Sequence, residues 1–233
     1  LGISHLKIHA KIALITRREN GQLRHYTHLS TGNYHSATAQ AYTDLALLTA
    51  HPGLGADAQH FFDRVCSGKV PGTFKHLVSA PRGLFHKISE QIAREIQAAR
   101  GGARARIFAK VNALVDPGVI GALYEASQAG VQVDLVVRGA CSLIPGVRGL
   151  SENIRVYSLV DRYLEHSRIY YFQSSQTLYL SSADWMPRNF FSRLELAFPI
   201  LCPKNLRFLE EGVLPTYLRD TQKGRELTPQ GAW

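Results

Sequence analysis

The chain contains the stretch His9-Ala10-Lys11-Ile12-Ala13-Leu14-Ile15 and a second stretch of the same kind, His166-Ser167-Arg168-Ile169-Tyr170-Tyr171-Phe172. Each stretch places a histidine and a basic residue two positions apart at the start of an apolar run. Side chains two apart on a β-strand point to the same side of the sheet. We therefore expect each histidine and its cation to share one face of a strand, where both can reach one ligand.

Matching motifs follow the two stretches. The first continues to Ser30-Thr31-Gly32-Asn33 and then to Asp44, and the second continues to Ser181-Ser182-Ala183-Asp184 and then to Glu195. The acid comes eleven residues after the last residue of the motif in both copies (33 to 44, and 184 to 195). A third His-x-Lys, His5-Leu6-Lys7, is not followed by these motifs. The repeated order indicates a duplication rather than chance.

This set of residues suits phosphoryl transfer with two histidines. One imidazole can attack phosphorus and form a phosphoramidate, which divides one difficult step into two easier ones. A second imidazole can give or take the proton of the entering or leaving oxygen, because its pKa lies near neutrality. We expect His9 and His166 in these roles, with Lys11 and Arg168 neutralising the phosphoryl oxygens.

The motifs supply further candidates for supporting roles. Asn33 and Asp184 follow small residues, which leaves room for close approach of a substrate. We expect Asp44 and Glu195 each to accept a ring N–H from the histidine of its own copy and so to fix its tautomer, as the carboxylate of a serine-protease triad does. The alternative for both acids is a plain surface charge at a strand end.

Composition describes a packed globular protein, with 45% hydrophobic and 19% charged residues. No apolar stretch approaches the length of a transmembrane helix. Cys66, Cys141 and Cys202 form no Cys-x-x-Cys pair, which argues against a disulfide framework or zinc knuckle and suits a reducing cytoplasm. We expect a cytoplasmic protein and leave membrane association open.

The net charge of +9 indicates a polyanionic partner. Charge alone does not distinguish DNA, phospholipid and inorganic polyphosphate. The sequence contains no helix-turn-helix, zinc finger or aromatic RNA-binding motif, so a nucleic acid is not the expected partner.

Strands and helices are expected to alternate, which predicts an α/β fold with mixed sheets flanked by helices. The expected strands are residues 8–15, 23–30, 107–111, 131–137, 154–159, 166–172 and 177–181, and the expected helices are 57–65, 84–99, 117–129 and 203–218. Hairpin turns are expected at 19–22 and 173–176.

Gly68, Pro71 and Gly72 interrupt this pattern. We therefore divide the chain into a first domain, 1–72, a second domain, 73–220, and a polar tail, 221–233. In the second domain residues 73–165 precede the histidine, whereas only eight residues precede the first. We expect the first domain to be truncated at its N-terminus and the tail to be truncated as well.

The repeated motifs resemble those of the phospholipase D superfamily. In that family an Asp lies five residues beyond the Lys of the first motif, where this chain has Thr16 and Gln173. The departure argues against a phosphodiesterase.

A more extensive resemblance covers residues 3–217. The matching strings are Lys7-Ile8-His9-Ala10-Lys11, Ser30-Thr31-Gly32-Asn33-Tyr34, Ala41-Tyr42-Thr43-Asp44, residues 137–146 (VRGACSLIPG), residues 160–166 (VDRYLEH) and residues 179–186 (YLSSADWM). These strings are similar to the C-terminal half of polyphosphate kinases. The resemblance implies a duplicated phospholipase D-like fold.

The resemblance also implies an activity, the reversible transfer of the ATP γ-phosphoryl group to inorganic polyphosphate. It implies that His9 is the phosphorylated nucleophile and that His166 acts as acid or base at the nucleotide phosphates. Tyr42 matches a residue that stacks on adenine, and Arg138 matches a ligand of the nucleotide phosphates. Without the resemblance, Tyr42 would be a half-buried aromatic residue and Arg138 a strand-end ion-pair partner.

The resemblance places the Mg²⁺ site and one further adenine contact upstream of Leu1. No residue of this chain is therefore assigned to a metal, and we expect the chain to be catalytically incomplete by itself. The expected partners are ATP, ADP and polyphosphate, and we expect a homo-oligomer.

Two alternatives stay open. A phospholipase D-like phosphodiesterase or nuclease would cleave diesters without a nucleotide. A binding module would hold a polyanion with salt-sensitive affinity and without turnover.

Overall fold

The computed structural model describes residues 2–233. Its largest layer is an eight-stranded mixed sheet, with β7, β8 and β9 parallel to one another and the other neighbouring strands antiparallel. Across the sheet the strands are β15 (Gly224–Glu226), β9 (Ile154–Leu159), β8 (Gln132–Val137), β7 (Arg106–Val111), β11 (Arg168–Phe172), β12 (Thr177–Ser181), β14 (Leu196–Pro199) and β6 (Val78–Ser79).

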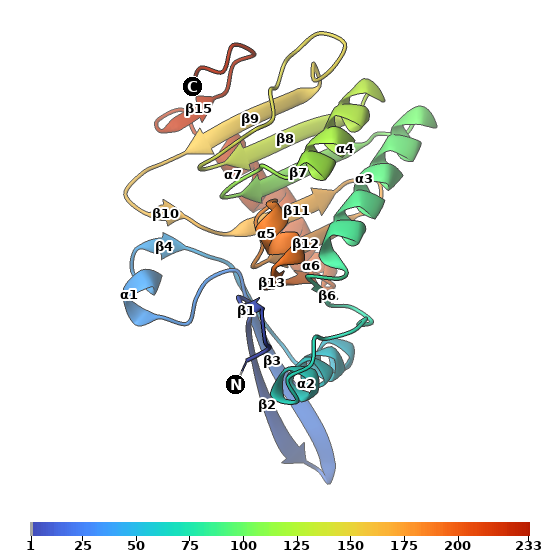
Figure 1. The fold of residues 1–233 in the computed structure, drawn as a ribbon, viewed down its shortest axis with the longest axis vertical. Coiled ribbons are helices and arrows are strands. Elements are labelled where there is room, and N and C mark those ends of the chain that lie inside the picture. Colours follow the sequence, from blue (N-terminus) through green and yellow to red (C-terminus); the bar gives the residue numbers. More distant parts are fainter. Residues whose placement is uncertain (1) are drawn as a thin grey trace.

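Helices cover both faces of this sheet (Figure 1). On one face, α3 (Leu84–Arg100) and α4 (Pro117–Gln128) pack on one buried cluster. On the other face, α6 (Pro203–Arg207), the π-helical turn η1 (Phe208–Val213) and α7 (Leu214–Leu218) pack on a second cluster. Strands covered on both faces read as continuous apolar runs. The predicted α/β class, with a mixed sheet flanked by helices, is confirmed.

Helix boundaries follow the local signals in the sequence. Asp116 accepts a hydrogen bond from the backbone N–H of Val119 (3.0 Å), and Pro117 follows it, so α4 begins where the Asp-Pro pair predicts. In α3, Ile88, Ile92 and Ile96 recur every four residues and are buried against the sheet.

A smaller antiparallel sheet comprises β2 (Lys11–Glu19), β3 (Gln22–Ser30) and β5 (Ala46–Thr49), with α2 (Pro52–Cys66) packed against it (Figure 1). The turn between β2 and β3 has Asn20 at φ 47° and Gly21 at φ 78°. A two-residue hairpin turn of this kind needs positive φ at both positions, so the predicted turn at 19–22 is confirmed.

Helix α2 begins at residue 52, five residues before the expected start at 57. Two glycines in its first turns weakened the helical pattern. A Cβ on Gly53 would lie 2.3 Å from the His76 ring, and one on Gly55 would lie 2.6 Å from the Cβ of His25. Glycine is present there because the helix packs closely on its neighbours, and the His51 side chain caps its first turn.

Two short parallel strand pairs lie between the two sheets (Figure 1). Strand β1 (Lys7–Ile8) pairs with β13 (Arg193–Leu194), and β10 (Leu164–Glu165) pairs with β4 (Tyr42–Thr43). Each pair joins the segment before one repeat's histidine to the segment before the other repeat's acid. The elements α1 (Ser36–Ala39) and α5 (Pro187–Phe191) complete the fold.

Four further expectations for individual segments need correction. The expected strand 166–172 begins only at Arg168, because the backbone N–H groups of His166 and Ser167 both bond to the Thr43 carbonyl. Residues 9 and 10 separate β1 from β2, so the expected strand 8–15 is interrupted, because the backbone N–H groups of His9 and Ala10 both bond to Leu194. The expected helix 203–218 contains a π-helical turn. The expected polar tail 221–233 supplies β15, because Asp220 accepts three backbone N–H groups and turns the chain back onto β9.

No helix within residues 2–233 is both long enough and apolar enough to cross a membrane.

Asp57 of α2 is buried and accepts hydrogen bonds from the backbone N–H groups of Lys75 (3.1 Å), His76 (2.6 Å) and Leu77 (2.9 Å), which fix the segment between the two sheets. We predict that Asp57→Ala destabilises this segment by about 3 kcal/mol, because a hydrogen bond to a charged group contributes roughly 1.5–3 kcal/mol. Hydrogen exchange of these three amides measures the effect. Asp63→Ala, on the exposed side of the same helix, is the control, and equal exchange in both variants would contradict the prediction.

Candidate active site

The first histidine is fixed from both sides of its ring. The Nδ1 of His9 lies 2.8 Å from Glu195 Oε2, and its Nε2 lies 2.9 Å from the Nζ of Lys11. Glu195 is fully buried and also accepts hydrogen bonds from Asn189 Nδ2 (2.6 Å) and the Ser182 hydroxyl. Because a carboxylate only accepts, the His9 ring donates from Nδ1 and presents its Nε2 lone pair to the ammonium group.

The second histidine has the same arrangement. The Nδ1 of His166 lies 2.9 Å and 3.0 Å from the two carboxylate oxygens of Asp44, and its Nε2 lies 3.0 Å from Nη1 of Arg168. The hydroxyl of Thr31 donates to Asp44 (2.6 Å). Both imidazoles therefore have a carboxylate at Nδ1 and a cation at Nε2.

The carboxylates are exchanged between the repeats. We expected Asp44 to orient His9 and Glu195 to orient His166, and the structure shows the opposite pairing. The short parallel pairs β1·β13 and β10·β4 cause the exchange, because each brings one repeat's histidine beside the other repeat's acid. The two repeats therefore build a single site.

Two hydroxyls that the sequence interpretation did not single out complete this geometry. The Thr31 hydroxyl accepts from the backbone N–H of Leu45 (3.1 Å), and the Ser182 hydroxyl accepts from the backbone N–H of Leu196 (3.1 Å). Each then donates to the carboxylate that holds a histidine. Their repeated place in the second position of both small-polar motifs was the available signal.

The two cations differ in how firmly they are held. Arg168 forms two hydrogen bonds of 3.1 Å to Asp184, which also accepts the backbone N–H of Asn112 (2.7 Å). Burial alone would raise the pKa of the Asp184 carboxyl, but the Arg168 guanidinium holds it below its usual value. Asn33 occupies the matching position of the first repeat and is exposed and neutral, so Lys11 has no such carboxylate beside it.

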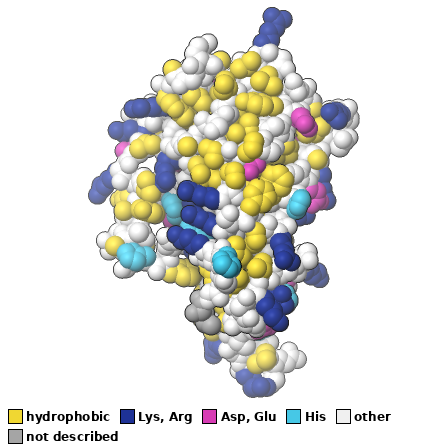
Figure 2. Space-filling model, viewed as in Figure 1, with side chains coloured by type: hydrophobic (Ala, Val, Ile, Leu, Met, Phe, Trp, Pro, Cys, Tyr) yellow, Lys and Arg dark blue, Asp and Glu magenta, His cyan; other side chains and the backbone are white. Residues whose placement is uncertain are grey.

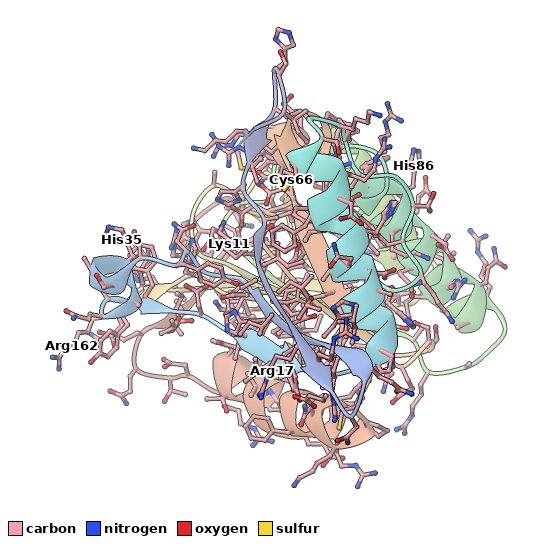
Figure 3. All side chains as sticks on the ribbon, turned by 90° about the horizontal axis from the view of Figure 1, so that it is seen from below. Lys11, Arg17, His35, Cys66, His86 and Arg162 are labelled. Atoms are coloured by element: carbon pink, nitrogen blue, oxygen red, sulfur yellow. The ribbon has the colours of Figure 1, made fainter. Side chains whose placement is uncertain are left out.

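Lys11 lies toward the middle of the molecule, away from the outlying His35 and Arg162 (Figure 3). Burial lowers the pKa of its ammonium group to about 8, against the opposing attraction of Glu195, and the nearby charge of Arg168 adds to the lowering. Lys11 can therefore lose its proton at a pH closer to neutral than an ordinary lysine does.

The residues expected at the nucleotide lie around His166. The ring of Tyr42 lies 5.0 Å from the His166 ring, with 54° between the planes. Arg138 donates from Nη1 to the carbonyl of Glu165 (3.1 Å), the residue before the histidine. Lys, Arg and His side chains gather near the middle of the face drawn in Figure 2. Of the expected site residues, Asn33, which is exposed, and Tyr42, whose ring lies beside His166, make no side-chain hydrogen bond within residues 2–233.

The residues described do not fit a magnesium site. Residues 2–233 contain no group of three His, Cys, Asp or Glu side chains placed to hold a metal ion. The carboxylates of Asp44 and Glu195 are occupied by hydrogen bonds to imidazoles and hydroxyls.

Burial lowers the pKa of His166 below its usual 6.5, and Asp44 opposes that shift through its hydrogen bond and its charge. We predict that Asp44→Asn lowers the pKa of His166 further, because burial and the charge of Arg168 then act with less opposition. Titration of the ring by NMR measures the shift. Glu195→Gln is the control and should leave His166 unchanged, and a shift in the control alone would contradict the exchanged pairing.

Comparison with known proteins places the chain in a family. Residues 1–70 match the model of polyphosphate kinase C-terminal domain 1, and residues 77–233 match that of C-terminal domain 2. Polyphosphate kinase from Neisseria meningitidis serogroup B is 48% identical over 235 residues, covering 100% of this chain and 34% of the relative. The one from Burkholderia vietnamiensis is 52% identical over 228 residues, covering 95% and 33%.

The crystal structure of polyphosphate kinase from Porphyromonas gingivalis superposes with a TM-score of 0.89 at 39% identity, over 97% of this chain and 35% of that one. The chain thus spans about a third of the length of the relatives it matches. The two family models match residues 1–70 and 77–233, and the superposed crystal structure covers 97% of this chain. The chain belongs to the polyphosphate kinase family.

Proposed function

We propose that the full-length protein transfers the γ-phosphoryl group of ATP reversibly to inorganic polyphosphate through a phosphohistidine on His9. The observation that carries the proposal is the pair of imidazoles held at Nδ1 by carboxylates, the buried Glu195 and the half-buried Asp44, each with a cation at Nε2. Family membership supports the same reaction.

The first step uses the lone pair on His9 Nε2. The nitrogen attacks the γ-phosphorus, the N–P bond forms, and the bond from the γ-phosphorus to the β,γ-bridging oxygen breaks, which releases ADP. The ring then carries positive charge, which the Glu195 carboxylate at Nδ1 stabilises. Lys11, which lies at Nε2 before attack, moves to the phosphoryl oxygens and neutralises them.

The second step passes the group to the polymer. A terminal oxygen of polyphosphate attacks the phosphohistidine, the P–N bond breaks, and His9 regains its lone pair. In the reverse direction the same two steps form ATP from ADP. His166 gives or takes a proton at the nucleotide phosphates, and Asp44 holds its ring for that task.

The nucleotide lies beside the second histidine in this proposal. Tyr42 stacks on the adenine, and Arg138 with Arg168 binds the phosphates. Two observations support the placement: the Tyr42 ring is adjacent to His166, and the Arg138 side chain reaches the same segment. The excess of basic over acidic residues, 27 to 18, favours retention of a polyanionic product.

We predict that the full-length protein incubated with γ-labelled ATP retains an acid-labile, base-stable label, and that His9→Ala abolishes it. His166→Gln should slow turnover by about 10²–10⁴-fold, because positioned proton transfer contributes that much. Retention of the label is measured on denatured protein. Labelling of the His9→Ala variant would remove His9 from its role.

We predict that Tyr42→Ala raises the KM for ATP by about tenfold or more and that Tyr42→Phe does not, since stacking on an aromatic ring contributes roughly 1–3 kcal/mol per base. Steady-state kinetics with ATP as the varied substrate measures the effect. Tyr34→Ala is the control, because Tyr34 is exposed and its hydroxyl bonds to His28. A loss of ATP affinity in the Phe variant equal to that in the Ala variant would contradict stacking.

A further inference from the structure

A buried lysine on a central strand of the large sheet contacts the residues on both sides of the second histidine. Lys110 of β7 is only 2% exposed. Its Nζ lies 3.1 Å from Glu165 Oε2, 2.9 Å from the Ser167 hydroxyl and 3.2 Å from the Ser167 carbonyl. The ring of Tyr217 from α7 lies 5.0 Å from the same nitrogen. A buried charge is tolerated only when it is paired and hydrogen-bonded, and Lys110 satisfies both conditions.

The groups that Lys110 holds flank His166 on both sides. Glu165 precedes the histidine and Ser167 follows it. Glu165 also accepts the Thr43 hydroxyl (3.0 Å), and the carbonyl of Thr43 accepts the backbone N–H groups of His166 and Ser167. One ammonium group thus fixes the histidine's chain and ties it to the residue before Asp44.

The residue directly after β7 holds the same segment. Asn112, two residues beyond Lys110, donates from Nδ2 to the carbonyl of His166 (3.3 Å). Lys110 in β7 and Asn112 just after it thus both hold the segment that carries His166. The segment of His166 is therefore held by Lys110 and Asn112, neither of which contacts the imidazole ring.

The first repeat has no glutamate at the position before its histidine. The position before His9 is Ile8 where the second repeat has Glu165, and the parallel pairing of β1 with β13 still forms. The repeated architecture therefore does not require the charges. Replacing a buried ion pair by apolar residues is often neutral or stabilising, so stability alone gives little reason for a lysine and a glutamate here.

We propose that Lys110 and Glu165 are positioning residues for His166, which hold its imidazole against Asp44 and the nucleotide phosphates during transfer. The inference rests on the proposed function. It adds to the site two charged residues that touch neither reacting atoms nor the imidazole rings. Misplacement of a catalytic group by about 1 Å can cost on the order of 10²-fold in rate.

The test is a set of rate measurements on the full-length protein with Lys110→Met, alone and combined with His166→Ala. We expect Lys110→Met alone to lower kcat by about 10- to 100-fold. With His166 already removed, the same substitution should change the residual rate by less than about twofold, because groups that act as a unit are not additive. Lys87→Met, which removes a partly exposed ion pair with Glu90 on α3, is the control and should leave kcat unchanged.

Glu165→Gln provides a second comparison that keeps the buried lysine and nearly the same shape. Glu165→Gln should also lower kcat, and this effect should disappear when His166 is replaced by alanine. If Lys110→Met does not fold, this variant decides the question. An equal loss in both backgrounds, or no loss when His166 is present, would overturn the positioning role while leaving the proposed function intact. Full activity of His166→Ala itself would overturn the acid/base role proposed for His166 and this inference with it, whereas labelling of His9→Ala would overturn the phosphohistidine step.

Discussion

The hydrogen bond from each imidazole Nδ1 to a carboxylate of the opposite repeat is the interaction on which the site depends. Glu195 is fully buried, and an unpaired carboxylate there would cost several kcal/mol. His9, Ser182 and Asn189 satisfy it together. Because the partner of each histidine comes from the other repeat, neither repeat can complete its own imidazole. The two short parallel strand pairs follow from the same requirement, since they carry each histidine to its acid.

The two repeats differ in the charged residues around their histidines, and this difference allows the two histidines to act differently. Arg168 is fixed by Asp184, whereas Lys11 faces no matching carboxylate because Asn33 stands in its place. A lysine is a compact charge on a flexible stem, while a paired guanidinium is fixed and always charged. The surroundings of His9 therefore suit a ring that accepts a phosphoryl group from one substrate and passes it to another. The surroundings of His166 suit a ring that keeps one orientation.

Much of the fold was predictable because it rests on local signals, and much of the site's pairing was not because it rests on long-range register. The helix entered at Asp116 and the turn at Gly21 each follow from two or three adjacent residues. The pairing of His9 with Glu195 joins residues 186 positions apart, and nothing in either segment specifies which acid it meets. The strand at 224–226 has no apolar alternation, so only its place beside β9 makes it a strand. Lys110 was missed because it lies inside an apolar run that reads as buried strand.

Phosphoryl transfer in this site depends on which ring nitrogen of each histidine carries the proton, and NMR of ¹⁵N-labelled histidine in the full-length protein measures this directly near neutral pH. Variants lacking His9 or His166 assign the signals. In the neutral form of each ring the proton should lie on Nδ1, because a carboxylate there can only accept and the cation at Nε2 needs a lone pair. A proton on Nε2 of either ring would leave that ring without the lone pair that phosphoryl transfer requires and would contradict the account.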